Sequence, residues 1–260
     1  MTKFRREKEM KFALLASGSK GNCALIQHGD TNIIIDCGTT KKYLNQCFET
    51  LAYDYHKADA LLITHTHKDH VSQIKMFRDL EVYATQAIDT PHLHHLEPFT
   101  TFTIKDLTIH VLPMSHDCEG TVGFVLETAN EKMVYVTDTG YIRDDVKPYL
   151  KDADYYIFES NHDIEMLMQT RRPVYIKQRI INDYGHLCNS YCAELLSDII
   201  SPTKTKEIVL AHISQEGNTY ELALQTLKDT FTTKHIDYSK MTLYAAKQFE
   251  IYQSQSGGES

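Results

Sequence analysis

The order of apolar segments along this sequence predicts an α/β fold with two β-sheets and helices on their outer faces. Strand-like and helix-like segments are mixed throughout the chain, and no internal repeat breaks their order. A length of 260 residues with 42% hydrophobic content is ordinary for one globular domain with a sizeable core. We therefore expect a single domain over residues 1–252, followed by a disordered tail over residues 253–260 that is rich in Ser, Gln and Gly.

The first third of the chain is predicted to begin with a meander of strands and to continue with a strand, a loop and a helix. After a charged lead-in, short apolar runs separated by turn-forming residues indicate strands. Longer segments with apolar residues three and four apart indicate helices. On this basis we expect strands at 12–16, 24–27, 32–36 and 58–64, and helices at 41–52 and 71–80.

The rest of the chain is predicted to be mostly strands. We expect strands at 101–104, 107–112, 122–127, 133–137, 155–159 and 207–211, and a helix at 191–200. The segment His92-Leu93-His94-His95 offers three imidazoles, but no acidic residue stands nearby at ligand spacing. Because it follows Pro91, a residue favoured in the first turn of a helix, we expect a surface helix there rather than a metal site.

Charge, hydropathy and cysteine content narrow the classes of protein to which the chain can belong. The net charge of −8 argues against bulk electrostatic binding of nucleic acid, so any such contact must be local. No run approaches the roughly 18 apolar residues of a membrane helix, and the run at 12–16 is too short for a signal peptide. We therefore expect a cytoplasmic protein without membrane contact. We also expect reduced cysteines, with Cys188 and Cys192 used for packing.

Metal-binding residues are concentrated in the segment His65-Thr66-His67-Lys68-Asp69-His70, at the end of a predicted buried strand. In an extended chain, residues two apart project to the same side, so His65 and His67 can hold one ion. Asp69 and His70 turn with the start of the next helix and can face a second ion. With 14 histidines and 35 acidic residues in the chain, this pattern would arise by chance in about 0.5% of such sequences. The segment is therefore our candidate dinuclear site.

This HxHxDH pattern resembles the signature of the metallo-β-lactamase fold superfamily. The resemblance implies an αββα four-layer sandwich, in which two mixed sheets are flanked by helices, and two divalent ions. Imidazole and carboxylate ligands suit Zn or Mn, with Fe as a further option. The order of ligands in the superfamily implies His116 for the first ion, Asp138 as a bridging carboxylate and His212 for the second ion. The full implied set is His65, His67, Asp69, His70, His116, Asp138 and His212.

Further segments are similar to one branch of that superfamily, the YycJ (WalJ, VicX) group. They are residues 17–22, 159–163, 185–189 and the segment around His212. Members of the branch are similar to phosphodiesterases and nucleases, so the resemblance implies a 5′ to 3′ exonuclease that acts on the ends of double-stranded DNA. The sequence departs from the branch at Cys188, where Ser is usual, and at Cys37, where Ala is common.

The implied chemistry is hydrolysis of a phosphodiester by a water that two ions activate, with Asp138 between the ions. Asp69 is counted with this catalytic machinery as a ligand. His186, in Gly185-His186-Leu187-Cys188-Asn189, is expected to donate a hydrogen bond to the phosphate or a proton to the leaving oxygen. We do not count it as a ligand. His162 is expected in the same neighbourhood.

Two segments are candidates for binding the phosphate groups of a substrate. In the loop 17–22, Ser19 and Asn22 accompany backbone N–H groups that can cradle an anion, although a tight strand connection explains the loop equally well. Four basic residues lie between two site motifs, where they form either a local anion-binding patch or a solvated face. They are Arg171, Arg172, Lys177 and Arg179.

The sequence leaves other functions open. A small-molecule or cyclic-nucleotide phosphodiesterase, as in the PhnP group, would use the same site, and so would a β-lactamase, a lactonase or a glyoxalase. A flavodiiron-type oxidoreductase is disfavoured because that group has Glu where this chain has His67. A metal-binding regulatory partner of two-component signalling is a further hypothesis. The sequence predicts no oligomeric state.

Overall fold

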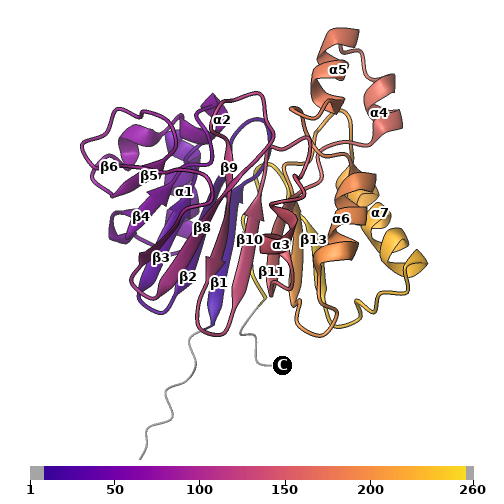
Figure 1. Cartoon of the computed structure of the whole chain (residues 1–260). Helices are drawn as coiled ribbons and strands as arrows, with labels where there is room; N and C mark the ends of the chain where they lie inside the picture. The colour runs from indigo at the N-terminus through magenta and orange to yellow at the C-terminus, as the bar shows by residue number, and fades with distance from the viewer. Residues whose placement is uncertain (1–8, 256–260) are drawn as a thin grey trace, which may run out of the picture.

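Two seven-stranded β-sheets lie face to face in the computed structural model, which describes residues 9–255 (Figure 1). Apolar side chains from both sheets form a shared core between them. Two further apolar cores lie where the outer faces of the sheets meet helices. The predicted four-layer arrangement of two mixed sheets flanked by helices is therefore confirmed.

The first sheet is built from the N-terminal part of the chain and one C-terminal strand. Its strands are β1 (Met10–Ala16), β2 (Cys23–His28), β3 (Thr31–Ile35), β4 (Ala60–Leu62), β5 (Val82–Ala84), β6 (Leu93–His95) and β14 (Tyr252–Gln253). They lie in the order β14-β1-β2-β3-β4-β5-β6. Strands β1 to β3 form an antiparallel meander, whereas β3 to β6 pair in parallel.

The second sheet is built from the C-terminal part. Its strands are β7 (Thr101–Ile104), β8 (Leu107–Pro113), β9 (Val122–Glu127), β10 (Lys132–Val136), β11 (Tyr155–Glu159), β12 (Glu207–Ala211) and β13 (Thr242–Ala245). They lie in the order β13-β12-β11-β10-β9-β8-β7. Strands β7 to β10 are antiparallel, and β10 to β13 are parallel.

Helices cover the outer faces of both sheets. They are α1 (Lys41–Thr50), α2 (Lys68–Val71), α3 (Lys147–Leu150), α4 (Ile164–Gln169), α5 (Val174–Ile181), α6 (Asn189–Ile199) and α7 (Tyr220–Thr233), with 3-10 turns η1 (Tyr55–Lys57) and η2 (Ile74–Met76). Helices α6 and α7 pack on each other beside the second sheet, and α4 and α5 project above it (Figure 1).

The central strand β11 shows how the pattern of residues produces the layers. All of its side chains are buried, as expected for a parallel strand that is covered on both faces. Because successive side chains point to opposite faces, Tyr155 and Ile157 enter the core between the sheets. Tyr156 and Phe158 enter the core under the helices. Its last residue, Glu159, is a buried carboxylate, which an apolar strand does not need for packing.

Most predicted strands are present, and four of them have the predicted bounds: 101–104, 122–127, 155–159 and 207–211. The helix predicted at 71–80 is wrong, because the chain forms only the short α2 and the turn η2 there. The surface helix predicted at residues 92–95 is also wrong. That segment is the edge strand β6, held by parallel pairing with β5. Its His94 stacks on Tyr83, with ring centroids 4.5 Å apart, and hydrogen-bonds to Glu81.

The C-terminal end of the described chain joins the first sheet. Gln253 pairs with Ala13, and the backbone N–H of Ser254 donates to the carbonyl of Phe12 at 2.9 Å. The predicted disordered tail is therefore wrong for residues 253–255, while residues 256–260 lie outside the described residues. Within residues 9–255, no helix is long and apolar enough to cross a membrane.

Candidate metal centre

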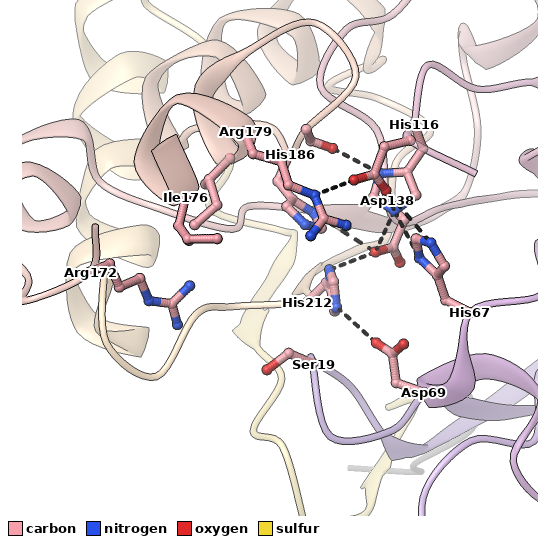
Figure 2. Close-up of a pocket in the computed structure, with 13 residues that line it drawn as sticks. Ser19, His67, Asp69, His116, Asp138, Arg172, Ile176, Arg179, His186 and His212 are labelled. Carbon is pink, nitrogen blue, oxygen red and sulfur yellow. Dashed lines mark hydrogen bonds and ion pairs between the residues drawn. The ribbon is translucent and has the colours of Figure 1, made fainter. Parts of the chain in front are cut away.

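The predicted metal ligands come from separate loops and cluster at the ends of the strands of both sheets. Five of them line one cavity there (Figure 2), while His65 and His70 are buried and do not line it. The HxHxDH segment follows β4 and runs into α2, while the other ligands follow β8, β10 and β12. Because parallel strands end at the same edge of a sheet, the loops that follow them lie together. The cavity has a volume of about 190 Å³.

The first group of ligand atoms consists of three imidazoles, from His65, His67 and His116, within 4.8 Å of one another. His65 is buried, and its Nδ1 lies 3.1 Å from the hydroxyl of Thr64. Its Nε2 has no hydrogen-bond partner among the described residues. The Nδ1 of His116 lies 3.0 Å from the carbonyl of Gly185, which leaves its Nε2 facing His67 at 3.3 Å.

The second group consists of Asp69, His70 and His212. Here a buried carboxylate stands behind each imidazole. Asp36 lies 2.8 Å from Nδ1 of His70, and Glu159 lies 2.9 Å from Nδ1 of His212. The Nε2 of His212 has no hydrogen-bond partner within residues 9–255. Such carboxylates fix the ring orientation of a metal-binding histidine and make it a better ligand.

Asp138 lies between the two groups and is 2% exposed. Its Oδ2 is 3.1 Å from Nε2 of His70. Its Oδ1 is 3.3 Å from Nδ1 of His212 and 3.8 Å from Nε2 of His116. A carboxylate in this position can contribute one oxygen to each group, as expected for the bridging ligand.

These residues fit divalent metal ions. Buried polar atoms normally have hydrogen-bond partners, so the buried and unpartnered Nε2 atoms of His65 and His212 need another explanation. A metal ion supplies one, because imidazole nitrogen beside carboxylate is the donor set that zinc and other transition metals use. The centre is therefore a site for divalent metal.

Comparison with known proteins identifies the family. Residues 31–213 match the β-lactamase superfamily domain. The chain belongs to this family. It is also 32% identical over 239 residues to the exodeoxyribonuclease YycJ of Bacillus anthracis, which covers 86% of this chain and 90% of that one.

Solved structures of metallo-β-lactamase-fold proteins share the architecture. YhfI from Bacillus subtilis superimposes with a TM-score of 0.69 at 18% identity, over 94% of this chain and 99% of that one. A diphosphatase of the PhnP family superimposes with a TM-score of 0.62 at 15% identity, over 95% of this chain and 98% of that one. The protein is thus a metal-dependent hydrolase of the metallo-β-lactamase fold and of the YycJ branch.

Electrostatics differ between the two ligand groups of this hydrolase. Burial lowers the pKa of His65 and of His116. Burial also opposes the charge on His212, but Asp138 and Glu159 outweigh it and raise the pKa of His212 to about 9. The pKa of His70 is likewise raised, since Asp36 and Asp138 outweigh burial. Without metal, His70 and His212 therefore hold protons at neutral pH, whereas His65 and His116 do not.

The backbone turns sharply at three of the positions around the metal. Asp36, Asp138 and His212 have positive φ angles of 60°, 57° and 53°. Residues other than glycine rarely adopt this left-handed conformation, although Asp and His do so more often than most. Each stands within two residues of the end of a strand, so the turn redirects the chain and aims a side chain at the centre.

Close backbone contacts hold the HxHxDH segment against the loop before β2 and the loop after β3. The N–H of Asn22 donates to the carbonyl of Asp69 at 2.8 Å, and the N–H of Cys37 donates to the carbonyl of His70 at 2.7 Å. At Gly38, a Cβ atom would stand 1.6 Å from the Asp69 carbonyl oxygen. Only glycine therefore fits at position 38, where its lack of a side chain lets the loop after β3 pack directly on the HxHxDH segment.

Sequence analysis missed Asp36 and Glu159, the carboxylates that support the second group. The sequence carries a signal for both. Each is an acid at the end of an otherwise apolar buried run, Ile33–Ile35 in one case and Tyr155–Phe158 in the other. A charge at such a position is costly unless it is paired.

Of the two histidines predicted to assist catalysis, only His186 reaches the metal cavity. His186 lines the metal cavity, with its Nδ1 2.7 Å from Glu159 and 3.7 Å from Asp138. Glu159 therefore holds both His186 and His212. His162 does not reach the metal cavity and instead lines the adjoining cavity, which it shares with His186.

The predicted phosphate-binding residues are only partly brought together. Ser19, Arg172 and Arg179 line the metal cavity (Figure 2). The structure contradicts the prediction for Lys177, which is buried and donates to the carbonyl of Met168 at 2.6 Å.

Two further residues of that prediction also lie away from the cavity wall. Asn22 is buried, and its side chain binds the backbone of Gly18 and lies 2.9 Å from Nε2 of His70. The prediction was wrong there because the amide organises the loop instead. Arg171 is exposed and does not line the cavity among the described residues.

Proposed function

We propose that this hydrolase is a two-metal phosphodiesterase that degrades DNA as a 5′ to 3′ exonuclease. The observation that carries the proposal is the pair of ligand groups around Asp138, which lie in a cavity flanked by Arg172 and Arg179. The exodeoxyribonuclease named among its relatives supports DNA as the substrate. The proposed ligands of two ions, Zn or Mn, are His65, His67, Asp69, His70, His116, Asp138 and His212.

Bound divalent ions would lower the pKa of a water and neutralise charge on the phosphate that it attacks. The protein residues orient the reacting groups. Asp138 fixes the position of the two ligand groups relative to each other, while Asp36 and Glu159 fix the orientation of the imidazole rings of His70 and His212. His186 is fixed at Nδ1 by Glu159, which accepts its N–H, so in the doubly protonated ring Nε2 can donate a hydrogen bond to the phosphate or a proton to the leaving oxygen.

Local positive charge lets an acidic protein approach DNA. Arg172 and Arg179 reach the metal cavity, although each already pairs with an acid, Glu216 and Asp117 respectively. A neighbouring hollow beyond Ser19 adds two lysines at its rim, Lys20 and Lys68. We expect weak, salt-sensitive binding with a slope that corresponds to about two to four phosphates.

A labelled-end assay tests the proposal. Linear duplexes labelled at the 5′ or the 3′ end are incubated with the protein and Mn, beside a closed circular duplex, a cyclic nucleotide and nitrocefin. Early release of the 5′ label with the circle intact is the expected result. Hydrolysis of the cyclic nucleotide alone would replace the exonuclease by a small-molecule phosphodiesterase. Hydrolysis of nitrocefin alone would remove the phosphodiester substrate altogether.

A further inference from the structure

The second cavity beside the metal centre has a volume of about 310 Å³, within the usual range for small-ligand sites. His186 belongs to the walls of both cavities, so a group in the second cavity would lie beside the metal site. Most of the wall is apolar or aromatic. The contributing residues are Gly140, Tyr141, Ile164, Ile181, Cys188 and Tyr191.

His162 is the most buried polar residue in the wall of this cavity, to which His186 and the exposed Asp183 also contribute. The side chain of His162 is 1% exposed, yet neither ring nitrogen has a hydrogen-bond partner among the described residues. Burial of an imidazole without partners costs free energy, so such a group points to a missing partner. Burial also lowers the pKa of His162 to about 4, so the neutral ring offers one donor and one acceptor.

The backbone holds His162 in place before any ligand arrives. Its segment forms an isolated β-bridge with Cys188, and its carbonyl accepts from the N–H of Asn189 at 2.8 Å. On the other side, the N–H of Asn161 donates to the carbonyl of Leu187 at 2.9 Å. A polar group fixed in the wall of a largely apolar hollow is preorganised for a flat ligand with polar edges.

We propose that this second cavity binds the base of the nucleotide whose phosphate occupies the metal centre, with His162 hydrogen-bonding to an edge of the base. A nucleobase combines aromatic faces, which suit Tyr141 and Tyr191, with donors and acceptors at its rim. The inference rests on the proposed phosphodiesterase function and adds to it the part of the substrate that is recognised. His162 is then a binding residue, and His186 stands between the base and the phosphate.

Calorimetry on the metal-loaded protein measures binding to the cavity directly. Deoxyadenosine 5′-monophosphate is compared with 2-deoxyribose 5-phosphate, which has the same phosphate and sugar but no base. We expect the nucleotide to bind about tenfold more tightly, the effect of one base–aromatic contact. His162→Leu and Tyr141→Ala should reduce this difference, whereas Tyr184→Ala, at an exposed tyrosine outside the cavity, should not. Equal binding of the two ligands by the wild-type protein would overturn the inference.

Cleavage assays separate this inference from the proposed function. Duplexes with an intact or an abasic 5′-terminal nucleotide are compared for the same proteins, and thermal unfolding confirms that each variant is folded. Should His162→Leu not fold, Tyr141→Ala alone decides. DNA cleavage without preference for the intact nucleotide refutes the base site and leaves the exonuclease standing. Base-dependent binding of the nucleotide without cleavage of DNA supports the base site and indicates that its ligand is a free nucleotide. The same result refutes the exonuclease.

Discussion

The two ligand groups of the metal centre use similar side chains but differ in the hydrogen-bond partners of their histidine Nδ1 atoms. In the first group, a hydroxyl and a backbone carbonyl support His65 and His116, and no carboxylate hydrogen-bonds to their Nδ1 atoms within residues 9–255. In the second group, buried carboxylates support His70 and His212. Together with Asp138, these carboxylates outweigh burial, so His70 and His212 hold protons when metal is absent, whereas burial keeps His65 and His116 neutral.

This difference indicates how each group should take up metal. A ligand must lose its proton before it binds a metal ion. His65 and His116 of the first group are already neutral. His70 and His212 of the second group must release protons before they bind, and that group then presents more negative charge to the ion. We therefore expect the two groups to differ in affinity, in pH dependence and in sensitivity to substitution of their outer partners.

Asp138→Ala should have the largest effect, since Asp138 lies between the two groups and contacts His70, His212 and His116. We expect turnover to fall by several orders of magnitude, because the position of the water and of both ions depends on this carboxylate. Metal content per chain and hydrolysis of bis-p-nitrophenyl phosphate are the measurements. Unimpaired turnover with full metal content would show that Asp138 is not the bridging ligand.

His186→Ala tests whether the second group extends beyond its predicted ligands, because His186 also lies with Asp138, Glu159 and His212 in a set of possible ligands. As an acid or a hydrogen-bond donor, its loss should leave metal content unchanged and lower turnover by about 10² to 10⁴. Metal analysis and kinetics on the same sample give the answer. Loss of one ion would make His186 a ligand.

Asp36→Asn should weaken metal binding most in the second group, by about 10- to 100-fold, the usual effect of removing a carboxylate behind a metal-bound histidine. A smaller effect on the first group is expected, because Asp36 also accepts from the Thr64 hydroxyl beside His65. Competition with a chelator measures each affinity. Glu127→Gln is the matched control, since Glu127 pairs with His110 at 3.2 Å outside the metal centre. An equal loss from both groups would mean that they are not independent.

The pH dependence of metal affinity should also differ between the groups. Because the pKa of His212 is raised to about 9 and that of His70 is raised as well, affinity of the second group should rise by at least about tenfold per pH unit between pH 7 and 9. The first group should stay nearly constant there, as the pKa of His65 and of His116 is lowered. Metal titrations at several pH values measure how the affinity of each group changes with pH. Equal changes in the two groups would show that their histidines do not differ in protonation.

The same pKa shift affects the stability of the metal-free protein. A raised pKa means that protonated His212 stabilises the folded state, fully so below its unfolded value of about 6.5. That contribution is lost as the pH rises through about 9. Chelator-treated protein should therefore unfold more easily at pH 9 than at pH 7, as measured by denaturant titration.

The sequence predicted the ligands better than their supporting partners, for a physical reason. His65, His67, Asp69 and His70 lie within one short segment, so their spacing alone shows that they can meet. Asp36 and His70 are 34 positions apart, and only the pairing of β3 with β4 brings them together. Without the fold, a buried acid at the end of a strand cannot be assigned to its histidine.

Local periodicity also failed where tertiary pairing decided the structure. Residues 92–95 have a helix-like start after Pro91, yet the edge of the first sheet draws them into β6. Lys177 has the charge for a phosphate contact, but its place on α5 directs the ammonium to the end of α4. In both cases the outcome depends on a neighbour that is distant in space from the motif that suggested the prediction.

The left-handed turns at Asp36, Asp138 and His212 bear on how this protein would respond to laboratory evolution. Each costs about 1 kcal/mol or more of folding free energy relative to glycine, which adopts that conformation freely. Glycine would relieve that strain but would also remove buried side chains that pair with their neighbours, Asp36 with His70 and His212 with Glu159. Selection for heat resistance therefore gains nothing from glycine at these positions and should retain all three residues.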